Sequence, residues 1–234
     1  MILSSPILDR CSKREENQSK KTTFTKNKPS FKTTNLEKIF NDLIDGYIDT
    51  KVGISKTFLS KALCRNLAEN LRTAYAQKQM IPAGTGNESS IIHNKLNRSD
   101  VILWLDRKHN NRYENSFFDL IDLFIIHLNS TCFTGISGYE FHYAMYEKGS
   151  FYKRHLDQFR NDDSRQYSVI FYLNEDWLAA DGGELCVYFD NHVQMISPEM
   201  GTTVFFKSSE LEHEVMPTNK ARLSIVGWLK TGMR

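Results

Sequence analysis

Three side chains in the C-terminal half of the chain are suited to holding one metal ion. His155 and Asp157 are separated by a single residue and follow a strand-like segment, and His213 precedes a second strand-like run. Because side chains alternate along an extended strand, His155 and Asp157 would point to the same face. Two imidazoles and one carboxylate make the facial triad that binds non-haem Fe(II) and leaves coordination positions open. These residues therefore predict an iron site.

An arginine downstream of His213 points to an anion beside that site. Arg222 lies in the apolar run 221–226, where a guanidinium is costly to bury without an anionic partner. A dicarboxylate would supply that partner through a bidentate salt bridge. Each feature also has a plainer reading. The His-x-Asp tripeptide is short enough to arise by chance as a surface pair, and Arg222 could reach solvent from an edge strand. Together the two features favour a metal site next to an anion site.

The elements that would position these residues are short and rich in β-forming side chains. Turn signals such as Asp181-Gly182-Gly183 separate them. The expected strands cover residues 139–146, 166–173, 185–189, 193–196, 202–206 and 223–229. Several short strands at regular spacing predict an all-β barrel or a double-sheet jelly roll.

Helical periodicity dominates the region before the strands. A capping box made by Thr34 and Glu37 predicts the start of a first helix. Two further helices are expected at about 56–79 and 116–130 from the spacing of their apolar residues. We therefore expect a basic, disordered leader over 1–33 and a helical support region with a lid segment over 34–137. A catalytic β core over 138–234 would form one domain with that helical region.

Composition and charge narrow the class of protein. The chain has 234 residues, 40% of them hydrophobic, which is enough for a core. Its net charge is +2, but residues 9–32 carry eight basic and three acidic side chains, which we interpret as a solubilising tail. Four scattered cysteines without a Cys-x-x-Cys pair argue against a zinc site or a disulfide scaffold. With neither a secretory signal nor an apolar span in the sequence, we expect a soluble protein of the cytoplasm.

The region 138–229 also carries five motifs in a fixed order. They are Tyr-x-x-His-x-Asp at 152–157, Tyr-Leu-Asn-x-x-Trp at 172–177, Gly-Gly-x-Leu at 182–185, His-Glu-Val-x-Pro at 213–217 and Arg-x-Ser at 222–224. A weaker sixth, Arg-x-Asp-x-x-x-Trp, covers 98–104. In this order they resemble the prolyl-hydroxylase branch of the 2-oxoglutarate oxygenases, which includes the hypoxia-sensing prolyl hydroxylases and their bacterial relatives. The resemblance implies a mainly β fold, a double-stranded β-helix (a cupin-like jelly roll) with N-terminal helices on one face.

The same resemblance implies an activity and a role for each matched residue. The expected activity is that of an Fe(II)- and 2-oxoglutarate-dependent dioxygenase, which hydroxylates an unactivated C–H bond with O2 and releases succinate and CO2. The expected target is a prolyl residue in a protein or peptide, with ascorbate as reductant. The resemblance assigns iron to His155, Asp157 and His213, the cosubstrate to Arg222, Tyr172, Tyr146 and Ser224, and the substrate to Tyr152 and Arg98.

Two other classes of function stay open at this point. A nucleic-acid oxygenase of the same superfamily would suit the basic N-terminal segment, although strands 139–146 and 166–173 lack a basic surface interleaved with aromatic residues. A catalytically silent jelly roll that retains a metal would bind a partner without turnover, although the triad with Arg222 argues against it. Salt-dependent DNA binding would support the former, and a failure to consume 2-oxoglutarate would support the latter.

Overall fold

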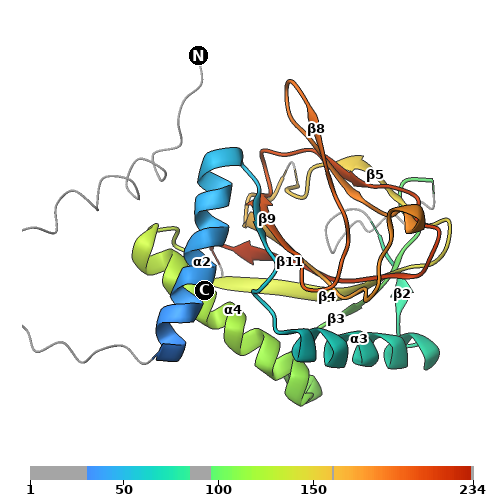
Figure 1. Cartoon of the computed structure of the whole chain (residues 1–234), viewed down its shortest axis with the longest axis horizontal. Coiled ribbons are helices and arrows are strands. Elements are labelled where there is room, and N and C mark those ends of the chain that lie inside the picture. Colours follow the sequence, from blue (N-terminus) through green and yellow to red (C-terminus); the bar gives the residue numbers. More distant parts are fainter. Residues whose placement is uncertain (1–30, 85–95, 160, 233–234) are drawn as a thin grey trace, which may run out of the picture.

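A computed structural model describes residues 31–84, 96–159 and 161–232 of the chain (Figure 1). The leader expected over 1–33 therefore lies outside the described residues, except that 31–33 already belong to a helix. Three α-helices lie within the described part, namely α2 (Phe31–Thr50), α3 (Lys61–Ala76) and α4 (Arg112–Thr131). Two short 3-10 turns, η2 (Arg107–His109) and η3 (Ala179–Asp181), join other elements.

The starts of α3 and α4 follow from local capping, and they differ from the expected starts at about 56 and 116. Helix α3 begins after Ser60, whose hydroxyl accepts a hydrogen bond from the Leu63 amide, and α4 begins after Asn111, whose side-chain oxygen accepts two amides of the first turn. The capping box expected at Thr34 was wrong as a helix start, because α2 already begins at Phe31. A capping pattern can occur inside a helix, since the same residue types are tolerated there.

Seven strands form a large antiparallel sheet. Their order is β1-β9-β6-β11-β4-β3-β2. The bounds are β1 (Gly53–Ser55), β2 (Ile81–Pro82), β3 (Val101–Trp104), β4 (Gly138–Tyr146), β6 (Arg165–Tyr172), β9 (Thr203–Lys207) and β11 (Arg222–Lys230). Three of them, β1 to β3, fall in the region expected to be helical support, so that region also supplies strands at both ends of the sheet.

Four strands form a smaller antiparallel sheet that faces the large one. Their order is β5-β10-β7-β8. The bounds are β5 (Tyr152–His155), β7 (Leu185–Tyr188), β8 (Val193–Ile196) and β10 (His213–Val215). The chain passes repeatedly from one sheet to the other, and the result is a double-stranded β-helix, or jelly roll, with helices packed outside it. The expected fold is thereby confirmed.

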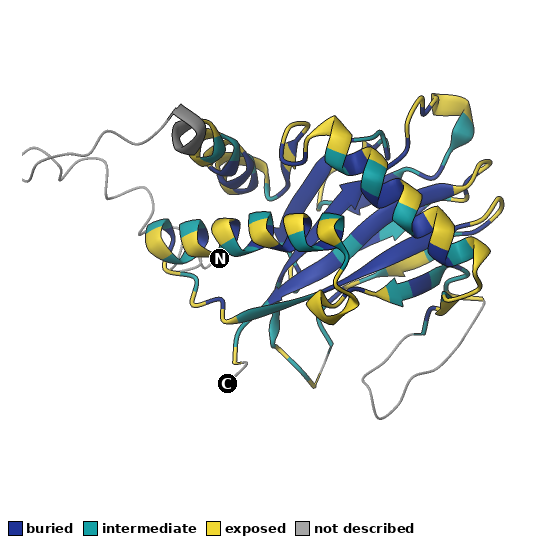
Figure 2. Ribbon diagram, turned by 90° about the horizontal axis from the view of Figure 1, so that it is seen from below, coloured by how far each residue is buried: buried dark blue, intermediate teal, exposed yellow. Residues whose placement is uncertain are grey.

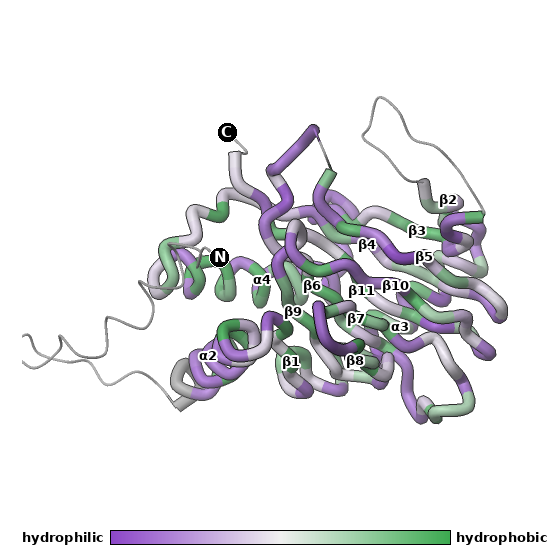
Figure 3. The backbone as a smooth tube through the Cα atoms, turned by 90° about the horizontal axis from the view of Figure 1, so that it is seen from above, coloured by the Kyte–Doolittle hydropathy of each residue, from purple (hydrophilic) through white to green (hydrophobic). Residues whose placement is uncertain are grey.

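The large sheet has a core on each of its faces. On one face, apolar side chains of α2, α3 and α4 pack against strand residues such as Phe171 and Phe205, and the helices cross this face with exposed residues on their outer sides (Figure 2). Hydrophobic and hydrophilic residues alternate along α2 (Figure 3), as amphipathic packing requires. On the other face, Val187, Val204 and Phe206 belong to a second core between the two sheets. Period-two alternation along the strands separates the two sets.

One glycine of the central strand β11 should be essential for stability. Gly227 pairs with Phe141 on β4 and Val169 on β6, and a Cβ at this position would lie 2.1 Å from a ring carbon of Phe141 and 2.3 Å from the Glu140 oxygen. We expect Gly227→Ala to lower the free energy of unfolding by about 3 kcal/mol, because the neighbouring strands must move apart. Urea unfolding followed by circular dichroism measures this change.

A matched glycine replacement isolates that steric effect. Gly149 has a positive φ of +86° and no heavy atom within 4 Å of an added Cβ. Gly149→Ala should therefore lose only about 1 kcal/mol, from backbone strain alone. Equal losses in the two variants would contradict the steric explanation for Gly227.

Candidate active site

Two strands of the small sheet bring the predicted metal ligands together. His155 ends β5, Asp157 follows two residues later, and His213 begins β10. The two histidines are directly paired across the β5–β10 ladder. One ligand atom from each of the three residues lies within 4.8 Å of the others. No other group of three or more His, Cys, Asp or Glu side chains in the described residues is arranged to hold a metal.

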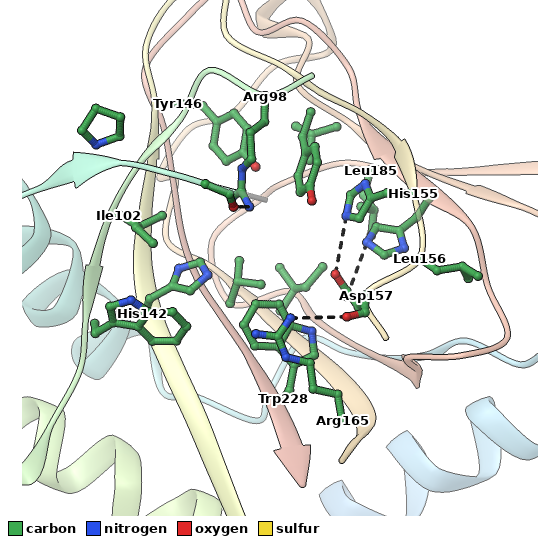
Figure 4. Close-up of a pocket in the computed structure, with 18 of the residues that line it drawn as sticks. Arg98, Ile102, His142, Tyr146, His155, Leu156, Asp157, Arg165, Leu185 and Trp228 are labelled. Atoms are coloured by element: carbon green, nitrogen blue, oxygen red, sulfur yellow. Dashed lines mark hydrogen bonds and ion pairs between the residues drawn. The ribbon is translucent and has the colours of Figure 1, made fainter. Parts of the chain in front are cut away.

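Backbone carbonyls fix the tautomer of both histidines. The Nδ1 atom of His155 lies 2.7 Å from the Lys153 oxygen, and that of His213 lies 3.1 Å from the Leu211 oxygen. Each Nδ1–H therefore donates to the carbonyl two residues before it, and each Nε2 keeps a free lone pair. Both Nε2 atoms face the Asp157 carboxylate at 3.5 Å, one to each oxygen (Figure 4). The three donor atoms thus converge on one point.

Burial and neighbouring groups hold His213 and Asp157 in the protonation states that bind a metal. Burial lowers the pKa of His213 to about 4, which keeps the imidazole neutral at physiological pH. Burial alone would raise the pKa of Asp157, but attraction to His213 and contacts with His155 and Ser168 outweigh it and place the pKa well below its usual range. The Ser168 hydroxyl donates to Asp157 Oδ2 at 2.6 Å. A neutral histidine and a carboxylate anion are the forms that bind a metal.

The Ser168 hydroxyl should strengthen metal binding through Asp157. Ser168 is fully buried and also exchanges a hydrogen bond with Ser208 at 2.9 Å, so its orientation is fixed. We expect Ser168→Ala to weaken Fe(II) binding about 10-fold, since loss of an outer hydrogen bond to a ligand has effects of that order. Anaerobic Fe(II) titration measures it, with the exposed Ser116→Ala as control. An unchanged affinity would show that Asp157 is held by other contacts.

Arg222 lies on the large sheet, at the start of β11, whereas the two histidines lie on the small sheet. Its side chain is 1% exposed, and its Nε donates to the Gly183 carbonyl at 2.8 Å. The rings of Tyr146 and Tyr172 lie 4.9 Å from the guanidinium carbon. None of the acidic side chains in the described residues forms an ion pair with it. A buried guanidinium in this state needs an anion to offset its lost hydration.

Two buried hydroxyl groups near Arg222 have unused hydrogen-bonding capacity. The hydroxyls of Tyr172 and Ser224 are buried and form no hydrogen bond of ordinary geometry with the described residues. Ser224 pairs directly with Tyr172 across the β11–β6 ladder, so the two hydroxyl-bearing side chains are neighbours. Unsatisfied buried groups of this kind are rare and indicate a missing ligand or water. The set fits the carboxylate of a bound dicarboxylate, as 2-oxoglutarate would present.

A single cavity of about 390 Å³ contains both the triad and Arg222. The expected substrate residues Tyr152 and Arg98 also line it. Arg98 is largely buried, forms an ion pair with Asp100 at 2.7 Å and lies 4.1 Å from the centre of the Tyr152 ring. Some lining residues also reach the surface, among them Leu156, which is 43% exposed.

Several residues of this cavity were not predicted from the sequence. Trp104, His142 and Trp228 line it, and so does Arg165. The guanidinium carbon of Arg165 lies 3.4 Å from the centre of the Trp228 ring. Its Nη2 is 2.7 Å from Glu140 Oε1, and its Nη1 donates to the Asp157 carbonyl at 3.3 Å. Period-two alternation back from Tyr146 and forward from Arg222 was the available signal, because it places His142 and Trp228 on the cavity face.

Comparison with known proteins shows which family has this fold and this arrangement of site residues. Residues 141–230 match the family model described as the 2OG-Fe(II) oxygenase superfamily. A crystal structure of a Pseudomonas putida prolyl-4-hydroxylase is 32% identical, covers 83% of this chain and 100% of its own, and superposes with a TM-score of 0.75. A Trichoplax adhaerens prolyl hydroxylase, solved with a hypoxia inducible factor peptide fragment, is 23% identical, with a TM-score of 0.77 over 87% of this chain and 94% of its own.

The chain belongs to the 2OG-Fe(II) oxygenase superfamily, and the resemblance seen in its motifs is confirmed. Its similarity extends to Egl nine homolog 1 of the rat, which is 37% identical over 84 residues, or 34% of this chain and 25% of that protein. The human counterpart matches over 20% of its length, so the chain spans a quarter or less of these curated relatives. None of the described helices is both long and apolar enough to cross a membrane.

Proposed function

We propose that the protein is an Fe(II)- and 2-oxoglutarate-dependent dioxygenase that hydroxylates a prolyl residue in a protein or peptide. The overall reaction converts the substrate C–H, O2 and 2-oxoglutarate into the alcohol, succinate and CO2. One observation carries the proposal. A buried guanidinium without an acidic partner among the described residues shares a cavity with a two-histidine, one-carboxylate cluster. That donor set, with open positions, is the one used by non-haem Fe(II) oxygenases.

Each side of the cavity has a separate task in this proposal. His155, Asp157 and His213 would hold Fe(II), and Arg222 would pair with the far carboxylate of 2-oxoglutarate, helped by nearby hydroxyls. The bound metal and cosubstrate supply the activation of O2 and the oxidation. The chain itself binds, orients and excludes water. The apolar residues Ile170, Leu185 and Val215, which line the same cavity, keep it poorly hydrated.

The choice of a prolyl target rests on the shape and chemistry of the remaining cavity wall. Trp104 and Trp228 lie with ring centres 6.4 Å apart and line the cavity with Ile102 and Val226. Such a surface suits a compact apolar ring, which the pyrrolidine of proline provides. The Pseudomonas putida relative is a prolyl-4-hydroxylase, and the Trichoplax adhaerens relative was solved with a peptide fragment bound. A peptide substrate for this chain is the analogous proposal.

The proposal also includes the oxidant, the reductant and the compartment. O2 would be the oxidant, and ascorbate would keep the iron ferrous between turnovers. Cys64, Cys132 and Cys186 are free, buried thiols, which suits a reducing compartment such as the cytoplasm.

Succinate formation tests the proposed reaction. Purified protein is supplied with Fe(II) and 2-oxoglutarate under air, with and without a lysate of the source cells, beside His155→Ala and the exposed control His192→Ala. We expect succinate formation in the wild type and in His192→Ala, and we expect the lysate to stimulate it. His155→Ala should form no succinate. No succinate from the iron-loaded wild type, even with lysate, would contradict the proposal and favour a silent metal-binding module.

A further inference from the structure

The cavity has a wall that serves neither the proposed metal nor the cosubstrate. It is formed by Trp104, His142 and Trp228 on the adjacent strands β3, β4 and β11. The imidazole of His142 lies 5.0 Å from the Trp104 ring centre in an edge-on arrangement and 5.6 Å from that of Trp228. Figure 4 shows His142 across the cavity from His155 and Asp157. This aromatic wall therefore faces the space left for a substrate.

His142 places one hydrogen-bonding group on this wall. The residue is 3% exposed, and its Nδ1 lies 3.2 Å from the Tyr143 carbonyl. That carbonyl can only accept, so Nδ1 carries the proton and Nε2 is left as an acceptor. Among the described residues, the Tyr143 carbonyl is the one hydrogen-bond partner of the ring. A polar side chain that lines a cavity at this depth is costly without a partner.

The imidazole remains an acceptor under physiological conditions. Burial lowers the pKa of His142 to about 4, and the positive charge of Arg98 acts in the same direction. Asp100 opposes this shift, but its carboxylate is already paired with Arg98 at 2.7 Å. The ring is therefore neutral at pH 7, and a ligand in the cavity that uses Nε2 must bring a hydrogen-bond donor.

A prolyl target restricts what that donor can be. Proline has no amide hydrogen of its own, and its ring offers only C–H groups. In a peptide, the obligatory donors next to the target are the backbone N–H groups of the flanking residues. A free amino acid would instead present its charged amine.

We propose that His142 accepts, through Nε2, a hydrogen bond from a flanking backbone N–H of a peptide substrate whose target ring packs against Trp104 and Trp228. This assignment rests on the proposed function and deepens it, because it makes His142 a contact to the main chain of the substrate beside the target. It also predicts that the enzyme recognises a backbone amide of the residue next to the target proline. The identity of the flanking side chain then matters less than the presence of its amide hydrogen.

N-methylated peptides test this contact directly. A library of acetylated and amidated pentapeptides with a central proline is screened by mass spectrometry for addition of one oxygen, with free L-proline as a further probe. The best peptide is then made with each flanking amide N-methylated in turn. We expect one of these methyl groups to lower kcat/KM about 10-fold in the wild type, the effect of losing one hydrogen bond in a desolvated site.

Variants of His142, each assayed with the methylated and the unmethylated peptide, complete a double-mutant cycle. In His142→Phe, which keeps an aromatic ring but has no acceptor, the methylated and unmethylated peptides should differ by less than about 2-fold. His142→Gln, which restores an acceptor, should recover part of the difference, and the exposed control His192→Phe should keep all of it. If His142→Phe does not fold, as judged by circular dichroism, His142→Met replaces it in the cycle.

Several outcomes would overturn the inference. An equal methylation penalty in wild type and His142→Phe would show that the contact is made elsewhere, and so would the absence of any penalty in the wild type. Preferential hydroxylation of free L-proline would show that the enzyme does not use a peptide amide next to the target. Succinate formation without hydroxylation of any library peptide would also overturn it while leaving the oxygenase activity intact. Absence of succinate would overturn the proposed function itself.

Discussion

The Arg222→Leu protein is expected to require at least about 30-fold more 2-oxoglutarate for half-maximal succinate formation. Breaking a buried charge pair by removing one partner has effects of about 2–5 kcal/mol, which correspond to about 30-fold to several thousand-fold in affinity. Arg222 is 1% exposed, and the neighbouring hydroxyls of Tyr172 and Ser224 carry no charge that could replace it. The KM for 2-oxoglutarate, measured with iron in excess, checks this result.

A surface arginine provides the matched control. Arg65 is exposed and pairs with Glu175 at 2.6 Å, so Arg65→Leu should leave the KM within about 2-fold, since exposed ion pairs contribute little. Arg222→Lys should fall between the leucine variant and the wild type, because lysine keeps the charge but loses the planar fork. A KM for Arg222→Leu close to that of the wild type would show that the cosubstrate carboxylate binds elsewhere.

The second large effect is expected from the carboxylate of the triad. Asp157→Ala should weaken Fe(II) binding more than about 100-fold and reduce succinate formation to background. Substitutions of residues that only support a ligand already change metal affinity by about 10- to 100-fold, and Asp157 would be a ligand itself. It is also the one anion of the three and lies 3.5 Å from both Nε2 atoms. Anaerobic Fe(II) titration and a succinate assay measure the two changes.

An exposed carboxylate in the following loop tests whether the effect is specific. Asp163 is exposed, so Asp163→Ala should bind Fe(II) and turn over like the wild type. Circular dichroism of Asp157→Ala should show a folded protein, because Ser168 and Ser208 can still hydrogen-bond to each other. Fe(II) bound with wild-type affinity by Asp157→Ala would exclude that carboxylate as a ligand.

The elements that were predicted well are those whose pattern extends over many residues. Strand β11 was expected over 223–229 and covers Arg222–Lys230, because an apolar run of that length with β-branched residues fits a buried strand. The strands β1 and β2 were missed. They contain three and two residues, which is too short for periodicity to be visible, and they form only because β9 and β3 present open edges.

For single residues of the cavity, too, only those with a recognisable pattern in the sequence could be assigned a role. His155, Asp157 and His213 could be grouped from their types and spacing, and the structure brings their ligand atoms together. His142 could not be given a role in this way, because its neighbours Trp104 and Trp228 come from other strands. Their proximity depends on the register Trp104↔His142 and Trp228↔Glu140, and sequence alone does not set a register between distant strands.

The separation of the site between two layers of the fold has a consequence for the choice of cosubstrate. His155 and His213 belong to the small sheet and Arg222 to the large one. Facing sheets stay about 10 Å apart, at a spacing set by the side chains packed between them, here including Val187 and Phe206. The side chains packed between the sheets therefore set the length of the dicarboxylate that can reach from the metal to the Arg222 guanidinium. Selectivity among dicarboxylates would be tuned by residues that never touch them.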